Sequence, residues 1–599
     1  MGSFRREAGL WLAALLALRV LCWAGLNGGE DCAYIDLAGR LGRDVLSSAQ
    51  GGRVAWTLWL ALCRVVAPVR GLSAGWVSLP PFALLVLLAA RWGWELGGKR
   101  AARAILLVAA VHPRLSYYAT LAYPETCSAA LLALSVSLLM LSRRSWSAGI
   151  LGGLAFLCHE VALAPLLLVP FLIREQRGRI ARYAAGFALV WAADAVLKTA
   201  LTGDPLHHFH QAVDVTSAAH RHWIASPAAV LRRTAVDWWR PMARPLDRLF
   251  VFDAGATALA LLGWLLALRS RQVLLVRIGA WWLLSLILLD LIPSSLFPYV
   301  PALSASNPRH LLPLALPLVL LAGNGLLWLL ARGWGRVAAA LFLAVSLGAS
   351  FVLGLDARHR VSVCARACGV LEGLPPEEVW ADSYSALMLR ALLPEPMVPR
   401  IRVIQAGTRA EGLKGFVLWD PVWWERLETR GRGSSILASE RGRWPCLATF
   451  EQRLRPSQWG RSVPPPAVLY RLGLPEPPVK GPVLDRLGHV GEGDALGAVQ
   501  VRDRARHLQD AVIGPRREAH LVHGPVQEAR LHREGAEGLD LLRAQPGVRF
   551  PLPLRLPASR LQHHLPGLGG RKPCLGLLER LARHPPHFQV DVDPVQQRS

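Results

Sequence analysis

Long apolar runs separated by short polar loops fill the first 355 residues of the chain. A run of roughly 17–25 apolar residues allows a helix to cross the hydrocarbon core of a bilayer. The pattern therefore predicts about eleven membrane-spanning helices; the fifth and sixth are short, and one re-entrant hairpin is an alternative for them. The predicted spans are 8–26, 75–95, 101–112, 122–141, 147–157, 159–173, 180–200, 254–270, 274–292, 310–331 and 335–355.

The apolar stretch 54–70 differs from these runs because Arg53, Arg64 and Arg70 interrupt it. A helix with an apolar body and several cationic side chains is stable in the plane of the membrane interface. We therefore expect an interfacial helix in this stretch. The first apolar run starts shortly after Arg5 and Arg6 and has no evident cleavage site, so we expect a retained span and not a cleaved signal peptide.

Arginine and lysine gather in alternate loops between the predicted spans. Short cytoplasmic loops carry most of the positive charge of membrane proteins, so this alternation predicts a cytoplasmic N-terminus. The basic residues of the predicted cytoplasmic loops are Arg5, Arg6, Lys99, Arg100, Arg103, Arg143, Arg144, Arg174, Arg177, Arg179, Arg182, Arg269, Arg271, Arg277, Arg332 and Arg336. The loops 27–74 and 201–253, and everything after residue 355, are then predicted to be extracytoplasmic.

The composition agrees with a membrane protein and bears on its partners and its source. Of the 599 residues, 53% are hydrophobic and only 18% are charged, which excludes an ordinary soluble protein. The net charge of +25 lies largely in short loops and not on one soluble face, so we expect no nucleic-acid partner. The strong preference for Arg over Lys is typical of a GC-rich gene. We therefore expect an integral protein of a bacterial inner membrane.

The pattern changes after residue 355. The segments "EEVWADSYS" and "GFVLWDPVWW" contain short apolar runs that end in Asp, as strands leading into loops do, and "PPPAVLYRLG" fits a closing strand. We therefore expect a transmembrane domain over 1–355 and a small extracytoplasmic α/β domain over 356–475. In this domain Cys364, Cys368 and Cys446 form either one disulfide or three free thiols.

The last segment, 476–599, is rich in Arg, His, Pro and Gly and has no sustained period. Such a composition does not supply enough regularly placed apolar surface for a packed core. We expect a disordered tail, or the product of a frameshift, and assign it no function. The predicted fold class is therefore mainly α: a polytopic membrane bundle with a small α/β domain and a disordered tail.

Acidic residues follow the first span directly, in the stretch "GGEDCAYIDLAGRL". Glu30, Asp31 and Asp36 lie there beside Tyr34, on the predicted outer face. A carboxylate beside low-dielectric lipid holds its proton more strongly than in water, which suits a general base. The alternative is a hydrated loop whose acids have no chemical role.

A second acid, Glu125, opens the fourth predicted span after "HPRLSYYATLAYP". An acid at a helix N-terminus is favourable with the helix dipole by roughly 0.3–1 kcal/mol, so a purely structural role is one interpretation. Pro124 fits that interpretation as well. The predicted topology nevertheless places Glu125 on the same face of the membrane as Glu30 and Asp31.

The order of these motifs resembles the polyprenyl-phosphate-sugar-dependent membrane glycosyltransferases of the C-type (GT-C) fold. Within that class the chain is similar to bacterial relatives of protein O-mannosyltransferases and of the aminoarabinose transferase that modifies lipid A. The similarity covers about 8–355 and, loosely, the outer domain to 475. Its motifs are Glu30-Asp31 with Tyr34 and Ala38, "LGGKRAARA" at 96–104, Pro113 and Tyr117 with Pro124 and Glu125, Gly203-Asp204-Pro205-Leu206, and "RHLLPLALP" at 309–317.

This resemblance implies an enzyme that moves a sugar from a polyprenyl-phosphate donor to an acceptor hydroxyl at the outer face, with inversion. It implies catalytic carboxylates among Glu30, Asp31 and Glu125. A cation must stabilise the leaving polyprenyl phosphate, and Arg309 is the best-placed candidate, with Arg114 and Lys198 as alternatives. Arg309 is equally well explained as an anchor of its span at the interface.

Three departures from the family pattern affect the expected site. The acidic pair is reversed, Glu before Asp, which leaves open which of the two is the base. His310 replaces a Tyr, and Cys158-His159-Glu160 replaces a Thr-Lys pair. The predicted residues that bind the donor phosphate or substrate are therefore Tyr34, His159, Arg309 and His310. Mannose, aminoarabinose, arabinose, glucose and galactose remain open as the sugar, and protein, lipid or glycan as the acceptor.

Two further functions compete with this hypothesis: a transporter or flippase of a lipid-linked saccharide, and a membrane scaffold without enzymatic activity. Transporters usually carry internal repeats and charged groups near the membrane midplane. Here no clear repeat is found, although Asp194 and Asp290 lie within or near the ends of predicted spans. A divalent metal is a further alternative, because His side chains cluster in the long outer loop. They are His207, His208, His210, His220 and His222. We nevertheless predict no metal site.

Overall fold

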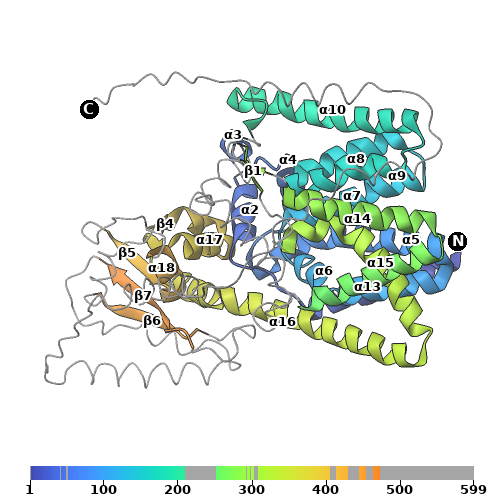
Figure 1. Cartoon of the computed structure of the whole chain (residues 1–599). Coiled ribbons are helices and arrows are strands. Elements are labelled where there is room, and N and C mark those ends of the chain that lie inside the picture. The colour runs from blue at the N-terminus through green and yellow to red at the C-terminus, as the bar shows by residue number, and fades with distance from the viewer. Residues whose placement is uncertain are drawn as a thin grey trace, which may run out of the picture. The chain divides into compact units, whose positions relative to one another are not determined.

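The computed structural model describes residues 2–40, 42–48, 51–207, 210, 251–291, 293–296, 299–301, 308–404, 413–428, 444–452 and 463–472. The predicted tail 476–599 and most of the loop 201–253 lie outside these residues. The described part is mostly helical, and Figure 1 shows most of its helices gathered in one bundle. This agrees with the predicted mainly α class.

The bundle contains long and short helices in chain order. Its α-helices are α1 (Gly2–Leu21), α2 (Glu30–Ala38), α3 (Arg43–Leu46), α4 (Val54–Val66), α5 (Leu79–Val111), α6 (Pro113–Tyr118), α7 (Pro124–Met140), α8 (Ser145–Cys158), α9 (Leu163–Leu172), α10 (Arg177–Thr202), α13 (Val251–Arg269), α14 (Val273–Leu291), α15 (Ala315–Leu330) and α16 (Gly333–Leu371). Three 3-10 helices join them: η1 (Gly71–Ser78), η2 (Glu160–Ala162) and η4 (Pro308–Leu314). A two-stranded antiparallel hairpin, β1 (Pro293–Leu296) and β2 (Tyr299–Pro301), precedes η4.

Four helical stretches among the described residues are long and apolar enough to cross a membrane by themselves. They are Gly71–Val111, Arg177–Thr202, Arg309–Leu330 and Gly333–Leu371. Seven shorter apolar helices accompany them. A membrane protein with several spans follows, whereas the number eleven stays a prediction.

The helix α5 covers most of two predicted spans, 75–95 and 101–112, and turns between them. Gly97 and Gly98 leave the helical conformation there, and Gly98 has a φ of +65°. Only glycine adopts that conformation without a steric penalty from Cβ. The "LGG" motif is thus the physical reason why one apolar stretch forms two helical segments.

The chain also breaks between α8 and α9, at the border of the predicted spans 147–157 and 159–173. His159 has an extended backbone at this break, with φ −159° and ψ 124°, and η2 follows it. Both helices are short, with 14 and 10 residues. The break places His159 and Glu160 at helix ends, where their side chains are free to face other elements.

Hydrogen bonds from a buried arginine connect α1 to the end of α5. The Arg19 guanidinium donates to the carbonyl oxygens of Ala109, at 3.1 Å, and Ala110, at 2.6 Å, and also bonds the Ser116 hydroxyl. Its carbon Cζ lies 4.8 Å from the ring centroid of Phe82. The last carbonyls of a helix have no partner within the helix, so Arg19 supplies donors that the end of α5 lacks.

A small α/β unit follows α16. Its strands run in the order β4-β3-β5-β7-β6, with β3 parallel to β4 and β5, and β7 antiparallel to both neighbours. The strands are β3 (Val379–Ala381), β4 (Ile401–Val403), β5 (Gly415–Trp419), β6 (Cys446–Phe450) and β7 (Ala467–Leu472), and the helices are α17 (Ser383–Leu392), η5 (Glu395–Arg400) and α18 (Pro421–Glu428). The three predicted strands correspond to β3, β5 and β7.

The predicted boundary at residue 356 lies within α16, which runs without interruption from Gly333 to Leu371. Figure 1 shows this helix extending from the bundle toward the sheet. The cysteines of this region are free thiols: Cys364 and Cys368 are buried, and Cys446 is exposed.

The helix α2 belongs to the same hydrophobic core as the α/β unit. This core joins Tyr34 and Ile35 of α2 to Val361 of α16 and to Met388 and Leu389 of α17. A separate core fills the helical bundle. The helix that begins at Glu30 is therefore held from the side of the α/β unit.

Glycine permits the close contact between α13 and α15. A Cβ atom at Gly263 would lie 1.9 Å from the carbonyl oxygen of Leu321, and one at Gly325 would lie 2.3 Å from that of Leu259. We predict that Gly263→Ala lowers the free energy of unfolding by about 1–3 kcal/mol, because the two helix backbones must separate. Thermal unfolding of the purified protein in detergent, followed by Trp fluorescence, measures this.

The matched control is Gly348→Ala in α16, where nothing lies within 4 Å of an added Cβ. Alanine is the better helix former, so this variant should unfold at the same temperature or slightly above it. Equal midpoints for both variants would contradict the proposed packing of α13 on α15.

Candidate active site

The acidic pair after α1 divides into two roles. The Asp31 carboxylate accepts hydrogen bonds from the backbone N–H of Asn27, at 2.5 Å, and of Gly29, at 2.8 Å, and is fully buried. Burial raises the pKa of the Asp31 carboxyl, and the two backbone donors act against that rise. Asp31 therefore holds the turn that leads into α2 and fixes the backbone beside Glu30.

Glu30 points the other way, toward Arg309 of η4. The Arg309 guanidinium donates two hydrogen bonds to it, from Nη1 to Oε2 at 2.8 Å and from Nη2 to Oε1 at 3.0 Å. This is the two-pronged geometry in which guanidinium binds carboxylate or phosphate. The side chain of Glu30 is 41% exposed, whereas that of Arg309 is 17% exposed.

Glu125 lies on the other side of Arg309. Its Oε1 atom is 3.4 Å from Arg309 Nε and 3.3 Å from His159 Nε2, and its side chain is fully buried. Pro124 starts α7 one residue earlier, so Glu125 occupies the first turn, where the helix dipole favours a negative charge. The carboxylate that the sequence analysis placed at a span entrance therefore faces a cation and a histidine.

A second arginine extends this group of charges. Arg53, at the N-cap of α4, forms two hydrogen bonds to Glu160, from Nε at 3.0 Å and from Nη2 at 2.7 Å. Its Nη1 atom is 3.8 Å from Glu30 Oε2. The charged residues Glu160, Arg53, Glu30, Arg309 and Glu125 thus alternate in sign along one continuous chain of contacts, which we call the charged cluster.

Two tyrosine rings lie beneath the arginines of this cluster. Tyr34 is 5.7 Å from Arg53 and packs edge-on against Trp56, and Tyr123 is 5.6 Å from Arg309, each measured from the guanidinium carbon to the ring centroid. A cation over an aromatic face is stabilised by the ring quadrupole. Tyr34 was predicted to bind substrate; the structure places it as a support for Arg53.

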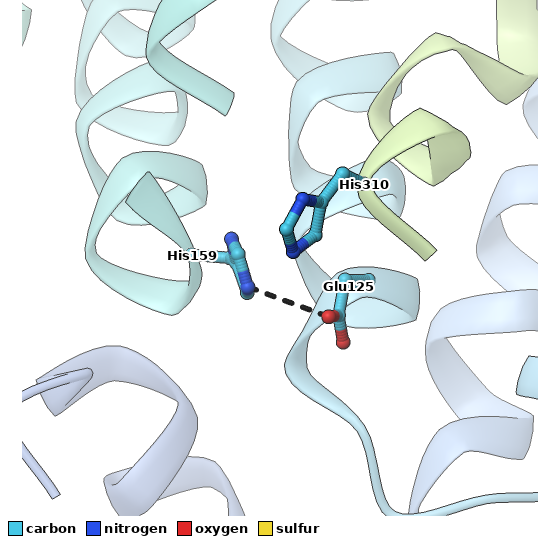
Figure 2. A group of neighbouring side chains, drawn as sticks. All are labelled: Glu125, His159 and His310. Atoms are coloured by element: carbon cyan, nitrogen blue, oxygen red, sulfur yellow. Dashed lines mark ion pairs between the residues drawn. The ribbon is translucent and has the colours of Figure 1, made fainter. Parts of the chain in front are cut away.

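The orientation of His159 fixes where its proton lies. The Nδ1 atom accepts a hydrogen bond from the backbone N–H of Val161 at 3.2 Å. An imidazole nitrogen that accepts is unprotonated, so in the neutral ring the proton lies on Nε2. That N–H faces Glu125 across 3.3 Å, as the dashed line in Figure 2 shows. His159 is therefore a donor toward the carboxylate.

His310 completes the view in Figure 2. Its ring centroid is 5.5 Å from that of His159, and the rings are inclined by 52°. Glu125, His159 and His310 offer ligand atoms that all lie within 4.8 Å of one another, a composition that suits a divalent metal. Two features oppose that use: His159 Nε2 carries the proton, and the Arg309 cation lies 3.4 Å from the same carboxylate oxygen.

The structure brings together five of the seven predicted site residues: Glu30, Glu125, His159, Arg309 and His310. The other two lie at the border of this group: Asp31 accepts hydrogen bonds from its own turn beside Glu30, and the Tyr34 ring lies against Arg53. The sequence analysis missed Arg53 and did not assign a role to Glu160. The signal for Arg53 was present, because an Arg directly before an apolar helix in a loop predicted to be extracytoplasmic is not explained by the preference of basic residues for cytoplasmic loops.

The other candidates have different surroundings. Lys198 is buried and donates from Nζ to the carbonyl oxygen of Leu46 at 2.9 Å. In the His-rich loop, His207 contacts the carbonyl oxygen of Ser47 and His210 contacts Asp204. The remaining members, His208, His220 and His222, lie outside the described residues, as does the side chain of Asp290. Near the site, the sulfur atoms of Cys127 and Cys158 are 3.6 Å apart.

No protein-family model matches the sequence, and no curated protein matches it. Two crystal structures of ArnT from Cupriavidus metallidurans are similar to the chain, one in the apo state and one bound to undecaprenyl phosphate. Their TM-scores are 0.44 and 0.42, with 13% and 14% sequence identity. The alignments cover 78% and 77% of this chain, and 98% and 97% of ArnT.

ArnT is an aminoarabinose transferase, one of the enzymes that the sequence motifs resemble. At these TM-scores and identities, the similarity concerns the general course of the chain and not the chemistry of the site.

We predict that Asp31→Ala destabilises the protein more than Glu30→Ala. The first change leaves two partly buried backbone N–H groups without an acceptor, which costs about 2–4 kcal/mol. The second removes a partly exposed ion pair, which contributes about 1 kcal/mol or less. Thermal unfolding in detergent measures both. A larger loss for Glu30→Ala would show that Asp31 does not hold the turn.

We further predict that zinc binds weakly or not at all to Glu125, His159 and His310. A ligand nitrogen must be unprotonated, and here the backbone of Val161 keeps the His159 proton on Nε2. A moderate excess of zinc should leave the thermal midpoint of the protein unchanged. A rise in the midpoint that disappears in His159→Ala would contradict this prediction.

Proposed function

We propose that the protein is an integral membrane glycosyltransferase that moves a sugar from a polyprenyl-phosphate donor to an acceptor hydroxyl at the extracytoplasmic face. The observation that carries the proposal is the meeting of Glu30 and Glu125 at Arg309, from three segments far apart in the sequence. Together they supply a carboxylate at a partly exposed position and a cation suited to phosphate. The order of the motifs along the chain supports the same reaction.

The proposed reaction forms one bond to the sugar, breaks one, and moves one proton. The acceptor oxygen bonds to the anomeric carbon of the sugar, while the bond from that carbon to the phosphate oxygen breaks. The hydroxyl proton passes to a carboxylate, and the electron pair of the broken bond leaves with the polyprenyl phosphate. Attack opposite to the leaving group inverts the configuration of the sugar.

Glu30 is the proposed base. It is 41% exposed and lies at the cluster, whereas Asp31 is buried and its two oxygens accept backbone N–H groups. Glu125 is fully enclosed between Arg309 and His159, so its proposed role is to position the Arg309 cation. Arg309 then stabilises the negative charge that develops on the leaving phosphate, and Arg53 adds a second positive charge nearby.

The test is transfer in vitro from a panel of polyprenyl-phosphate sugars, with the product detected by mass. We predict that Glu30→Gln, Glu125→Gln and Arg309→Lys each lower the rate of transfer, by about 10²–10⁴-fold where a proton transfer or a charge contact is lost. The matched control is Glu378→Gln, which removes the same charge from an exposed ion pair with Arg402 in the α/β unit. This control should transfer sugar at the original rate.

The assay also separates the competing functions. Transfer that survives all three site changes in folded protein would show that these residues are not the active site. If the unaltered protein forms no product but moves a labelled lipid-linked saccharide across vesicle membranes, it is a transporter and the proposal is wrong.

A further inference from the structure

We propose that Glu30 occupies the binding position of an anionic phosphate group and that the phosphate of the polyprenyl lipid displaces it. The inference rests on the proposed function, because it identifies the state of the same site before the donor binds. Glu30 then acts as an internal latch: it neutralises the arginines in the resting protein and is released by the donor.

Geometry supports this exchange. A phosphodiester presents two unesterified oxygens to the two N–H groups of a guanidinium, as the Glu30 carboxylate does to Nη1 and Nη2 of Arg309. Glu30 also lies 3.8 Å from Arg53 Nη1. An anion in its place therefore meets both arginines of the cluster.

Exposure distinguishes Glu30 from the other acids. Its side chain is 41% exposed, against 26% for Glu160 and 0% for Glu125. Glu160 is held by two hydrogen bonds to Arg53, and Glu125 is enclosed. Glu30 is thus the acid of the charged cluster that can turn into water without leaving a buried charge behind it.

The count of charges favours an exchange over an addition. The cluster holds two arginines, Arg53 and Arg309, against three acids, so an added anion would meet an excess of negative charge. A phosphodiester carries one negative charge, as Glu30 does, so Arg309 keeps one anionic partner in this position after the exchange, while the Glu30 carboxylate turns toward solvent. The turn held by Asp31 keeps the backbone in place, so only the Glu30 side chain needs to rotate.

The exchange makes the proposed base, Glu30, depend on the binding of the lipid-linked sugar. In the resting state both Glu30 oxygens accept hydrogen bonds from Arg309, and the carboxylate is not directed at an acceptor hydroxyl. Once the phosphate takes over the Arg309 donors, the freed carboxylate is available to take a proton. The base would then become competent only when a donor is present.

The experiment measures binding and not turnover. Purified full-length protein in detergent is titrated with undecaprenyl phosphate, the phosphomonoester that the proposed reaction releases, and complexes are counted by native mass spectrometry. Glu30→Gln removes the competing charge, so we predict about fivefold tighter binding, the equivalent of one partly exposed ion pair. Glu30→Ala should give a gain of the same sign, and Arg309→Lys should weaken binding. Glu378→Gln serves as the matched charge control and should bind as the unaltered protein does.

Two further ligands identify the group that is recognised. Undecaprenol lacks the phosphate, so its binding should not respond to Glu30→Gln. Inorganic phosphate lacks the lipid; a gain with this ion in Glu30→Gln would assign the exchange to the free anion as well as to the head group. Thermal midpoints without ligand confirm that each variant is folded.

The binding measurements with the two Glu30 variants decide whether the latch exists. Unchanged or weaker binding of undecaprenyl phosphate by both Glu30→Gln and Glu30→Ala, in folded protein, means that Glu30 does not compete with phosphate. The proposed function fails separately, if the unaltered protein transfers no sugar. Absence of undecaprenyl phosphate binding by every variant would contradict both.

Discussion

The guanidinium of Arg309 is shared between Glu30 and Glu125, and the surrounding elements are arranged to permit this. A partly buried cation needs a partner for each of its donors, because unpaired charge in a low-dielectric site costs several kcal/mol. The partners come from α2 and α7, and η4 carries the arginine itself. The break between α8 and α9 then adds His159 to Glu125 and Glu160 to Arg53. Five segments that are distant in sequence are thus held together by charge: α2, the start of α4, α7, the break between α8 and α9, and η4.

Much of this site could be predicted from the sequence, but only at the level of which residues share a face. The alternation of basic loops placed Glu30 and Glu125 on one side of the membrane, and the structure joins them through Arg309. Sequence did not distinguish the two acids of the pair. Whether a carboxylate faces Arg309 or accepts the N–H groups of Asn27 and Gly29 depends on its side-chain torsion angles. Adjacent acids have the same composition around them. Asp31 was therefore included among the catalytic candidates although it holds a turn.

The pair of Arg53 and Glu160 shows more clearly which contacts could not be predicted from the sequence. The two residues are 107 positions apart, and nothing in the apolar pattern says which helix ends are neighbours. Their meeting depends on the packing of short helices, which hydrophobic periodicity does not specify. The fold was predictable where local signals are strong, as at Gly97-Gly98 in α5 and at the three strands that end in Asp or close the sheet. It was not predictable at β4, which has three residues, or along α16, where a change of composition does not interrupt the helix.

The shared core of α2 and α17 has a consequence for how such a chain can change over evolutionary time. Glu30 begins a helix that packs on Met388 and Leu389 of the α/β unit, so this unit is part of the scaffold of the site. An exchange of the α/β unit between related chains would have to preserve the surface that meets α2. The residues of the second core of this unit, which include Trp419 and Trp424, are not under that restriction. Sequence variation is therefore expected there, while the face toward α2 is inherited together with the charged cluster.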